Sequence, residues 1–170
     1  MARPAVVALN VILVVLVSVV ADANLIARTC KRTTNPYCVK MLLADPWSAK
    51  ATTVRELAGV ALDIAAAAVR DGSATVHSKY LGHQGKPLED TLLGCEWMYG
   101  HAVGEARAAA DAFRSGEYRD AVRHQLAGHY AAILCEEMIS HCASESPVAD
   151  ADRRTVQHCN LAVDLIELLH

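Results

Sequence analysis

Apolar residues recur every three or four positions along most of the chain, which is the spacing of one face of an α-helix. The clearest run begins at Leu88, ends at Phe113 and alternates spacings of four and three throughout. Its members are Leu88, Leu92, Cys95, Tyr99, Ala102, Ala106, Ala109 and Phe113. This pattern predicts a long helix whose single apolar seam packs inside a bundle.

Three further stripes of the same kind predict three more helices. They comprise Val54, Leu57, Ala61, Ile64 and Ala68; then Val122, Leu126, Tyr130 and Ile133; and finally Val156, Cys159, Val163, Ile166 and Leu169. Ser48 or Thr52 is expected to cap the first helix, because their hydroxyls can accept orphan amide protons. Asp71-Gly72 is a candidate interruption of that helix, and Pro87 is expected at the first position of the second.

Short turns separate these helices, with "GHQGKP" at 82–87, "RSGEY" at 114–118 and "SESPVAD" at 144–150. No segment sustains a period of two, so we expect no sheet. Four helices joined by short turns run up-down-up-down. The predicted fold is all-α: a four-helix bundle over 47–170, preceded over 24–46 by a helical hairpin stapled by a disulfide.

The start of the chain resembles a secretory signal peptide. Arg3 is followed by an apolar run over 5–20, and Ala21-Asp22-Ala23 matches the small-x-small pattern of a cleavage site. The alternative is a membrane anchor, but a span normally needs about 20 apolar residues. We therefore expect residues 1–23 to be a signal peptide that is cleaved after Ala23, and the product to be secreted and free of the membrane.

Composition agrees with a helical protein that is not a nucleic-acid binder. The formal net charge is −3 and stays so without the signal, because that segment carries one charge of each sign. Such a balance does not favour nucleic acid or polyanions as partners. Aromatic residues make up only 5% of the chain, and the abundant alanine favours close-packed helices.

The spacing of the six cysteines favours two disulfides. Cys30 and Cys38 would lie about 12 Å apart on one continuous helix, so bonding them requires the chain to turn, and we expect the turn at Asn35-Pro36. Cys95 and Cys135 are equidistant from Ser115 in the second turn, so they should face each other across antiparallel helices. Cys142 and Cys159 are centred slightly beyond the last loop, which leaves a third bridge and two free thiols as open alternatives.

No catalytic constellation accompanies these features. A Gly-x-Ser-x-Gly elbow is missing from the sequence, and so is the pair of Glu-x-x-His motifs that a di-iron site in a helix bundle requires. His124 and His129 are five residues apart and point in different directions on a helix. Glu137 and His141 share a face, but such a pair is usually a surface ion pair. We expect no enzymatic activity, no metal, no cofactor and no small-molecule substrate.

Taken together, the signal, the Cys-x7-Cys hairpin and the disulfide-linked bundle resemble the plant invertase and pectin methylesterase inhibitors. The resemblance covers Asn24 to His170. The matching pieces are "IARTCKRTTNPYCVKMLLADP" (26–46), "CEWMYGHAV" (95–103), "SGEYRDA" (115–121) and "CEEM" (135–138). It implies a protein inhibitor of the cell wall or apoplast that covers its target's substrate cleft in a 1:1 complex, and it implies the pairs Cys30–Cys38 and Cys95–Cys135.

The resemblance favours pectin methylesterase over acid invertase as the target. Invertase inhibitors carry a Pro-Lys-Phe motif near the turn where this chain has Glu117-Tyr118-Arg119. The "SGEY" turn is instead similar to the Ser-Gly-Asp-Tyr turn of pectin methylesterase inhibitors. Leu134 departs from them, since they usually have threonine before the second bundle cysteine. The alternatives are an inhibitor of a cell-wall or vacuolar acid invertase, a secreted helical binding module without inhibitory activity, and a carrier of an apolar ligand.

Polar residues on the second and third bundle helices are the candidates for target contact. The selected residues are Glu96, Glu117, Tyr118, Arg119, Arg123 and Glu136. Tyrosine and arginine are enriched at binding hot spots; the alternative is that these side chains only solvate the bundle. Because His101, His124 and His129 lie on the same helices, we also expect binding to depend on pH between about 5 and 7.

Overall fold

The computed structural model describes residues 25–169, and within them every regular element is helical. The signal peptide expected over 1–23 lies outside the described residues. A short helix covers 25–30 and is followed by α2 (Cys38–Ala44) and the 3₁₀ turn η1 (Ser48–Lys50). The long helices are α3 (Val54–Gly82), α4 (Glu89–Arg114), α5 (Tyr118–Ser140) and α6 (Ala149–Glu167). None of the described helices is long and apolar enough to cross a membrane.

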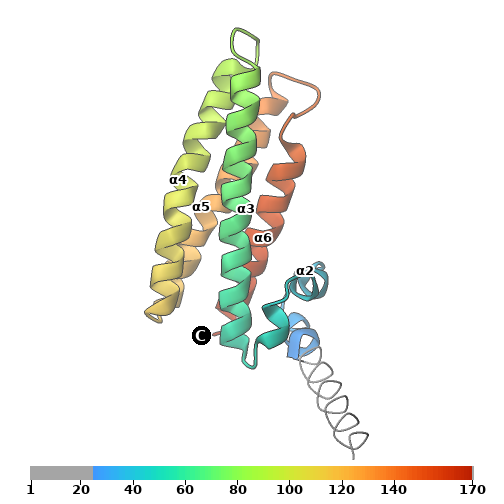
Figure 1. The fold of residues 1–170 in the computed structure, drawn as a ribbon, viewed down its shortest axis with the longest axis vertical. Coiled ribbons are helices and arrows are strands. Elements are labelled where there is room, and N and C mark those ends of the chain that lie inside the picture. Colours follow the sequence, from blue (N-terminus) through green and yellow to red (C-terminus); the bar gives the residue numbers. More distant parts are fainter. Residues whose placement is uncertain (1–24, 170) are drawn as a thin grey trace, which may run out of the picture.

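The long helices form the up-down-up-down bundle that the sequence predicts (Figure 1). Each one packs against two neighbours: α3 against α4 and α6, and α5 against the same pair. The hairpin made by 25–30 and α2 lies beside the end of the bundle where α3 begins (Figure 1). The fold prediction is confirmed.

The first bundle helix begins with a capping box at Thr53. Its side chain accepts a hydrogen bond from the Glu56 backbone N–H at 3.1 Å, and the Glu56 carboxylate accepts from the Thr53 N–H at 3.3 Å. Two orphan amide protons of the first turn are thereby satisfied. The prediction that Ser48 or Thr52 caps this helix was wrong. The cap is the residue after Thr52, and Ser48 belongs to the 3₁₀ turn η1.

Neither Asp71-Gly72 nor Pro87 acts as the sequence suggested. The first bundle helix continues through Asp71-Gly72 to Gly82. A glycine is needed at position 72 because the Tyr99 ring packs against its backbone. A Cβ at Gly72 would lie 2.6 Å from a Tyr99 ring carbon. Pro87 precedes Leu88, the N-cap of α4, and therefore lies outside the helix.

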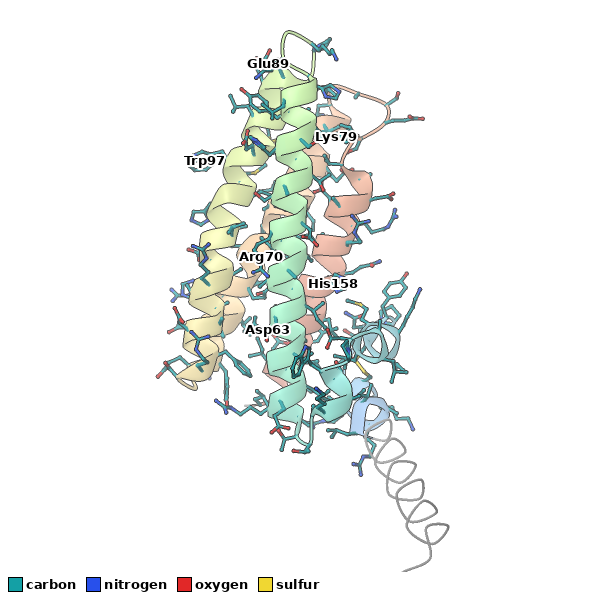
Figure 2. All side chains as sticks on the ribbon, in the orientation of Figure 1. Asp63, Arg70, Lys79, Glu89, Trp97 and His158 are labelled. Carbon is teal, nitrogen blue, oxygen red and sulfur yellow. A yellow bond between two sulfur atoms is a disulfide. The ribbon has the colours of Figure 1, made fainter. Side chains whose placement is uncertain are left out.

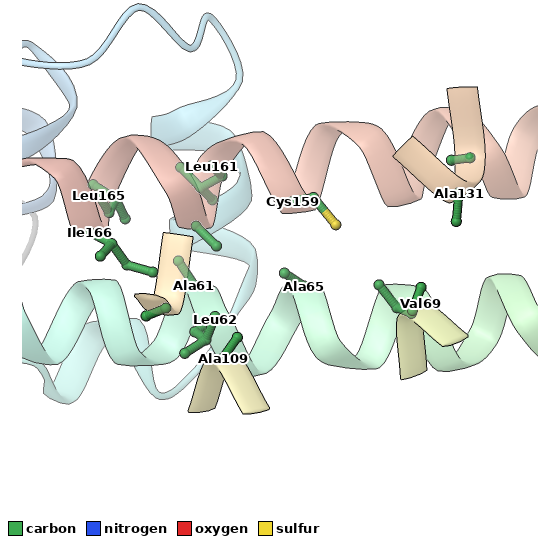
Figure 3. Packing of buried hydrophobic residues seen from close by; sticks show 14 of the residues in the cluster. Ala61, Leu62, Ala65, Val69, Ala109, Ala131, Cys159, Leu161, Leu165 and Ile166 are labelled. Atoms are coloured by element: carbon green, nitrogen blue, oxygen red, sulfur yellow. The ribbon is translucent and has the colours of Figure 1, made fainter. Parts of the chain in front are cut away.

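The core is built largely from alanine and other small residues. From Leu92 to Phe113 every predicted seam position of α4 is buried, and Leu88 is partly buried. Small side chains of α3 interleave with Leu161, Leu165 and Ile166 of α6 (Figure 3). Each fully buried leucine contributes about 1.5–3 kcal/mol of transfer free energy. The stripes predicted for α3 and α6 are right in part, with Leu57, Ala61, Cys159 and Ile166 buried and the rest partly buried.

The stripe predicted for α5 was wrong for its second half, because Val122 and Leu126 are partly buried but Tyr130 and Ile133 are exposed. Tyr130 and Ile133 are 54% and 41% exposed, whereas the buried positions are Ala121, Gln125, Gly128, Ala131, Ala132, Cys135 and Ile139. Small residues face the core because α5 approaches closely: a Cβ on Gly128 would lie 2.6 Å from Val69 and 2.9 Å from the Cys159 sulfur. The large apolar side chains are therefore left on the outside.

Both predicted disulfides are present. Cys30 and Cys38 are bonded with 5.6 Å between their Cα atoms, and Cys95 and Cys135 with 5.0 Å. The turn between the first pair is held by Asn35, whose side-chain oxygen accepts from the Tyr37 N–H at 3.0 Å across Pro36. The third pair is not formed: Cys142 is exposed and Cys159 is buried, and both are free thiols.

The free thiols should react very differently. Burial raises the pKa of the Cys159 thiol to about 12, so at neutral pH it is both shielded and protonated. We expect a maleimide to label the native, unreduced protein once, at Cys142, and the denatured protein at a second site, Cys159, as read by mass spectrometry. A Cys142→Ser variant should lose only the fast label. A denatured, unreduced protein without reactive thiols would contradict the structure.

Candidate functional site

Exposed apolar side chains gather on the outer surface of α4 and α5. This α4–α5 face comprises the apolar side chains of Leu93 and Trp97 of α4 and of Tyr130, Leu134 and Met138 of α5, together with the exposed imidazole of His101 of α4. On each helix the three residues are four apart, so they form a line along it. Isolated exposed apolar residues need no explanation, but a contiguous group marks an interaction surface.

The two lines lie side by side because they are equidistant from the turn between the helices. Leu93 is as far before the turn as Met138 is after it, and the same holds for Trp97 with Leu134. The contacts agree, since a Cβ on Gly94 would lie 2.7 Å from the Met138 methyl carbon. Trp97, His101, Tyr130 and Leu134 also line one shared hollow. The α4–α5 face is therefore one continuous strip.

Trp97 is the most prominent side chain of the strip. It is 76% exposed and projects from α4 away from the bundle (Figure 2). Its side chain borders two hollows. One, of about 230 Å³, is lined mainly by Tyr130, Ala131 and Leu134, and the other by Leu93, Gly94 and Glu96. An exposed indole that borders two mostly apolar hollows is well suited to anchor a protein partner.

The strip is held rigidly from behind. The Cys95–Cys135 bond joins α4 to α5, and both cysteines are fully buried. A hydrogen bond also links the two helices: the Glu105 carboxylate of α4 lies 2.7 Å from His124 Nδ1 of α5. The same carboxylate lies 3.8 Å from His101 Nε2. The hydrogen bond from His124 lowers the pKa of Glu105. A surface fixed in this way loses little conformational entropy when it binds a partner.

The predicted contact residues near the α4–α5 turn lie together at one end of the bundle. Glu117, Arg119 and Arg123 are exposed, and Arg123 pairs with Asp120 at 2.9 Å. Tyr118 is half-buried, with its ring centroid 5.6 Å from that of Phe113 and its hydroxyl accepting from Arg55 at 2.9 Å. Their role in target binding stays a prediction, and Tyr118 additionally closes the end of the core.

The other two predicted contact residues lie elsewhere, and each has a hydrogen-bond partner in another part of the chain. Glu96 binds His77 of α3 at 2.5 Å and borders the hollow beside Trp97. Glu136 is half-buried and accepts from the Ser146 hydroxyl at 2.5 Å, on the side of α6. The structure thus divides the predicted residues among three places rather than gathering them on one surface.

Sequence reasoning missed most of the α4–α5 face because it assigned Tyr130 to the core. A signal for the correct face was available in Cys135. If that cysteine is bonded inside the bundle, the residues four and seven positions before it, Ala131 and Gly128, share its face. Tyr130 and Leu134 then point outward.

The described residues offer no site for a metal. Between residues 25 and 169, no group of three or more histidine, cysteine or acidic side chains is placed to hold an ion.

Comparisons with known proteins identify the scaffold. The family model described as plant invertase/pectin methylesterase inhibitor matches residues 24–165. A crystal structure of mutant form A of a pectin methylesterase inhibitor from Arabidopsis is 21% identical, with a TM-score of 0.72 over 84% of this chain and 95% of that one. A crystal structure of a pectin methylesterase inhibitor from Arabidopsis thaliana is 20% identical, with a TM-score of 0.64 over 85% and 95%. No curated protein matches the chain.

Leu92 and Leu93 are adjacent in the sequence, but the first belongs to the core and the second to the α4–α5 face. Leu92 is fully buried, whereas Leu93 is 47% exposed. We expect Leu92→Ala to lower the free energy of unfolding by about 2–5 kcal/mol, because it opens a cavity. Leu93→Ala should change it by less than about 1 kcal/mol. Urea denaturation measures both values, and equal losses would mean that Leu93 belongs to the core.

Proposed function

The chain belongs to the plant invertase/pectin methylesterase inhibitor family, and from that premise we propose that it inhibits a pectin methylesterase by occluding the active-site cleft in a 1:1 complex. The α4–α5 face supplies the contact surface. No catalytic group or cofactor takes part, because inhibition follows from covering the cleft.

The observation that carries this proposal is the apolar strip centred on Trp97. On an inhibitor scaffold, an exposed tryptophan that borders two hollows is the residue type and position expected of a hot spot. The exposed charges of Glu117, Arg119 and Arg123 at one end of the helices supply a polar rim. Leu134, which replaces the threonine usual in these inhibitors, fits this interpretation because it is part of the strip.

The turn between α4 and α5 supports pectin methylesterase as the target. Where it leads into α5 the chain has Glu117-Tyr118-Arg119, whereas invertase inhibitors have Pro-Lys-Phe near this turn. We also propose that the protein acts outside the cell, in the plant cell wall, after a signal peptide has been removed following Ala23. The two disulfides suit an oxidising compartment.

A direct assay decides between the candidate targets. The disulfide-bonded protein is titrated against a purified plant pectin methylesterase and, separately, against a cell-wall acid invertase at mildly acidic pH. Loss of pectin methylesterase activity at near-stoichiometric amounts is expected. Inhibition of invertase alone would transfer the proposal to that enzyme. If neither enzyme is slowed, the protein is a binding module without inhibitory activity and the proposal is wrong.

Trp97 and Trp47 form a matched pair for testing the surface. Both are exposed, at 76% and 63%, but Trp47 lies beside α3 and α6 and carries Lys50 over its ring. We expect Trp97→Ala to weaken binding to the inhibited enzyme about 30-fold or more, the size of a hot spot. Trp47→Ala should change the dissociation constant less than about threefold. Calorimetry or surface plasmon resonance gives both constants, and the reverse order would exclude the α4–α5 face.

A further inference from the structure

A cluster of buried polar side chains joins the bundle helices about one helical turn along α4 from Cys95. Asp152 of α6 is 1% exposed, and one of its carboxyl oxygens accepts from the Tyr99 hydroxyl of α4 at 2.5 Å. The Thr155 hydroxyl lies 3.3 Å from that of Tyr99 and 3.2 Å from the Ala68 carbonyl oxygen of α3. The cluster thereby reaches α3, α4 and α6.

The second carboxyl oxygen of Asp152, Oδ2, has no hydrogen-bond donor. It is buried and accepts nothing from the described residues. The carboxyl group of Glu136 on α5 faces Asp152 and acts on it by its charge and by a hydrogen bond. Glu136 in turn accepts from the Ser146 hydroxyl at 2.5 Å. No lysine, arginine or histidine pairs with either carboxyl group in the described part of the chain.

Two adjacent carboxylates with no cation between them strongly disfavour double ionisation. A single proton removes the conflict, because a protonated Oδ2 donates to Glu136 while Oδ1 continues to accept from Tyr99. We propose that the buried Asp152 carboxyl keeps a proton that it donates to Glu136, and that this contact is a pH-sensitive latch that fastens the start of α6 to α5 and α4. The latch closes when the proton is bound and is weakened when the proton is lost to solvent.

The latch lies where it can affect the connection between α5 and α6. Ser146, which donates to Glu136, also accepts from the Val148 N–H at 3.3 Å, directly before α6 begins. Loss of the proton therefore places the repulsion between the end of α5 and the first turn of α6. Within residues 25–169, the titratable groups that act on Asp152 are Glu136 and Tyr99, and the Tyr99 hydroxyl stays protonated because burial raises its pKa.

The direction of the pH effect follows from the surroundings of Asp152. Burial raises the pKa of this carboxyl from its ordinary 3.8 to about 7; the charge of Glu136 acts in the same direction and the Tyr99 hydrogen bond in the opposite one. Below about pH 4 the folded and unfolded chains both bind the proton. Between about 4 and 7 only the folded chain keeps it, so stability falls as pH rises, and above about 7 the loss is complete.

The variant Asp152→Asn isolates this effect. Its amide donates to Glu136 and its carbonyl accepts from Tyr99, which reproduces the protonated pair without a proton to lose. Denaturation of both disulfide-bonded proteins gives their folding equilibrium constants from pH 4.5 to 8. We expect the ratio of wild type to variant to fall about tenfold per pH unit up to pH 6.5 and to level off above about 7. A ratio that stays constant or rises over this range overturns the proposal.

Exposed Asp150 supplies the matched control, because it lies two residues away and pairs with Arg153. Asp150→Asn should give a ratio that varies less than about threefold over the same pH range. A second measurement does not require the Asn variant to fold: carbon NMR of the Asp152 carboxyl should titrate near pH 7 in the wild type and at lower pH in Glu136→Gln. Titration of the wild-type group near pH 4 would contradict the latch.

Discussion

The close approach of α5 to the rest of the bundle determines most of what the protein presents to its surroundings. Gly128 allows it, since any side chain there would collide with Val69 and the Cys159 sulfur, and the Cys95–Cys135 bond holds it on the side of α4. A helix that packs this closely must turn its small residues inward. Tyr130 and Leu134 are consequently left on the surface, where they join Trp97 in the α4–α5 face. The same constraint therefore creates both the core and the proposed binding surface.

The bundle combines an apolar exterior strip with a polar interior cluster, which reverses the usual distribution of residues at both places. Departures of this kind concentrate where function or specificity competes with stability. On the outside, a disulfide and the Glu105–His124 bond hold the strip in place. On the inside, Tyr99, Asp152 and Glu136 link α4, α6 and α5 through one proton. A rigid surface and a pH-dependent clamp can therefore be built into a single small fold.

The sequence predicted the fold well because the information needed for it is local. Three- and four-residue spacings identify helices, and the symmetric position of Cys95 and Cys135 about the turn identifies their pairing. The face of α5 was mispredicted because hydrophobicity alone favours Tyr130 over Gly128 for the core, and only the distance between helices corrects that choice. The partner of Asp152 was equally hidden, since Glu136 reaches it from another helix. The spacing of apolar residues within one helix does not tell which side chains from different helices contact each other in the bundle.

Hydroxyl-radical footprinting of the protein, alone and in complex with pectin methylesterase, tests the central claim that the α4–α5 face is the binding surface. Trp97, Tyr130 and Met138 are exposed and belong to residue types that this reagent oxidises readily, as are Trp47 and Tyr37 on the side of the hairpin. The structure predicts that complex formation protects the first three and leaves Trp47 and Tyr37 as reactive as before. Protection of Trp47 and Tyr37, with Trp97 still oxidised at its free rate, would contradict the claim.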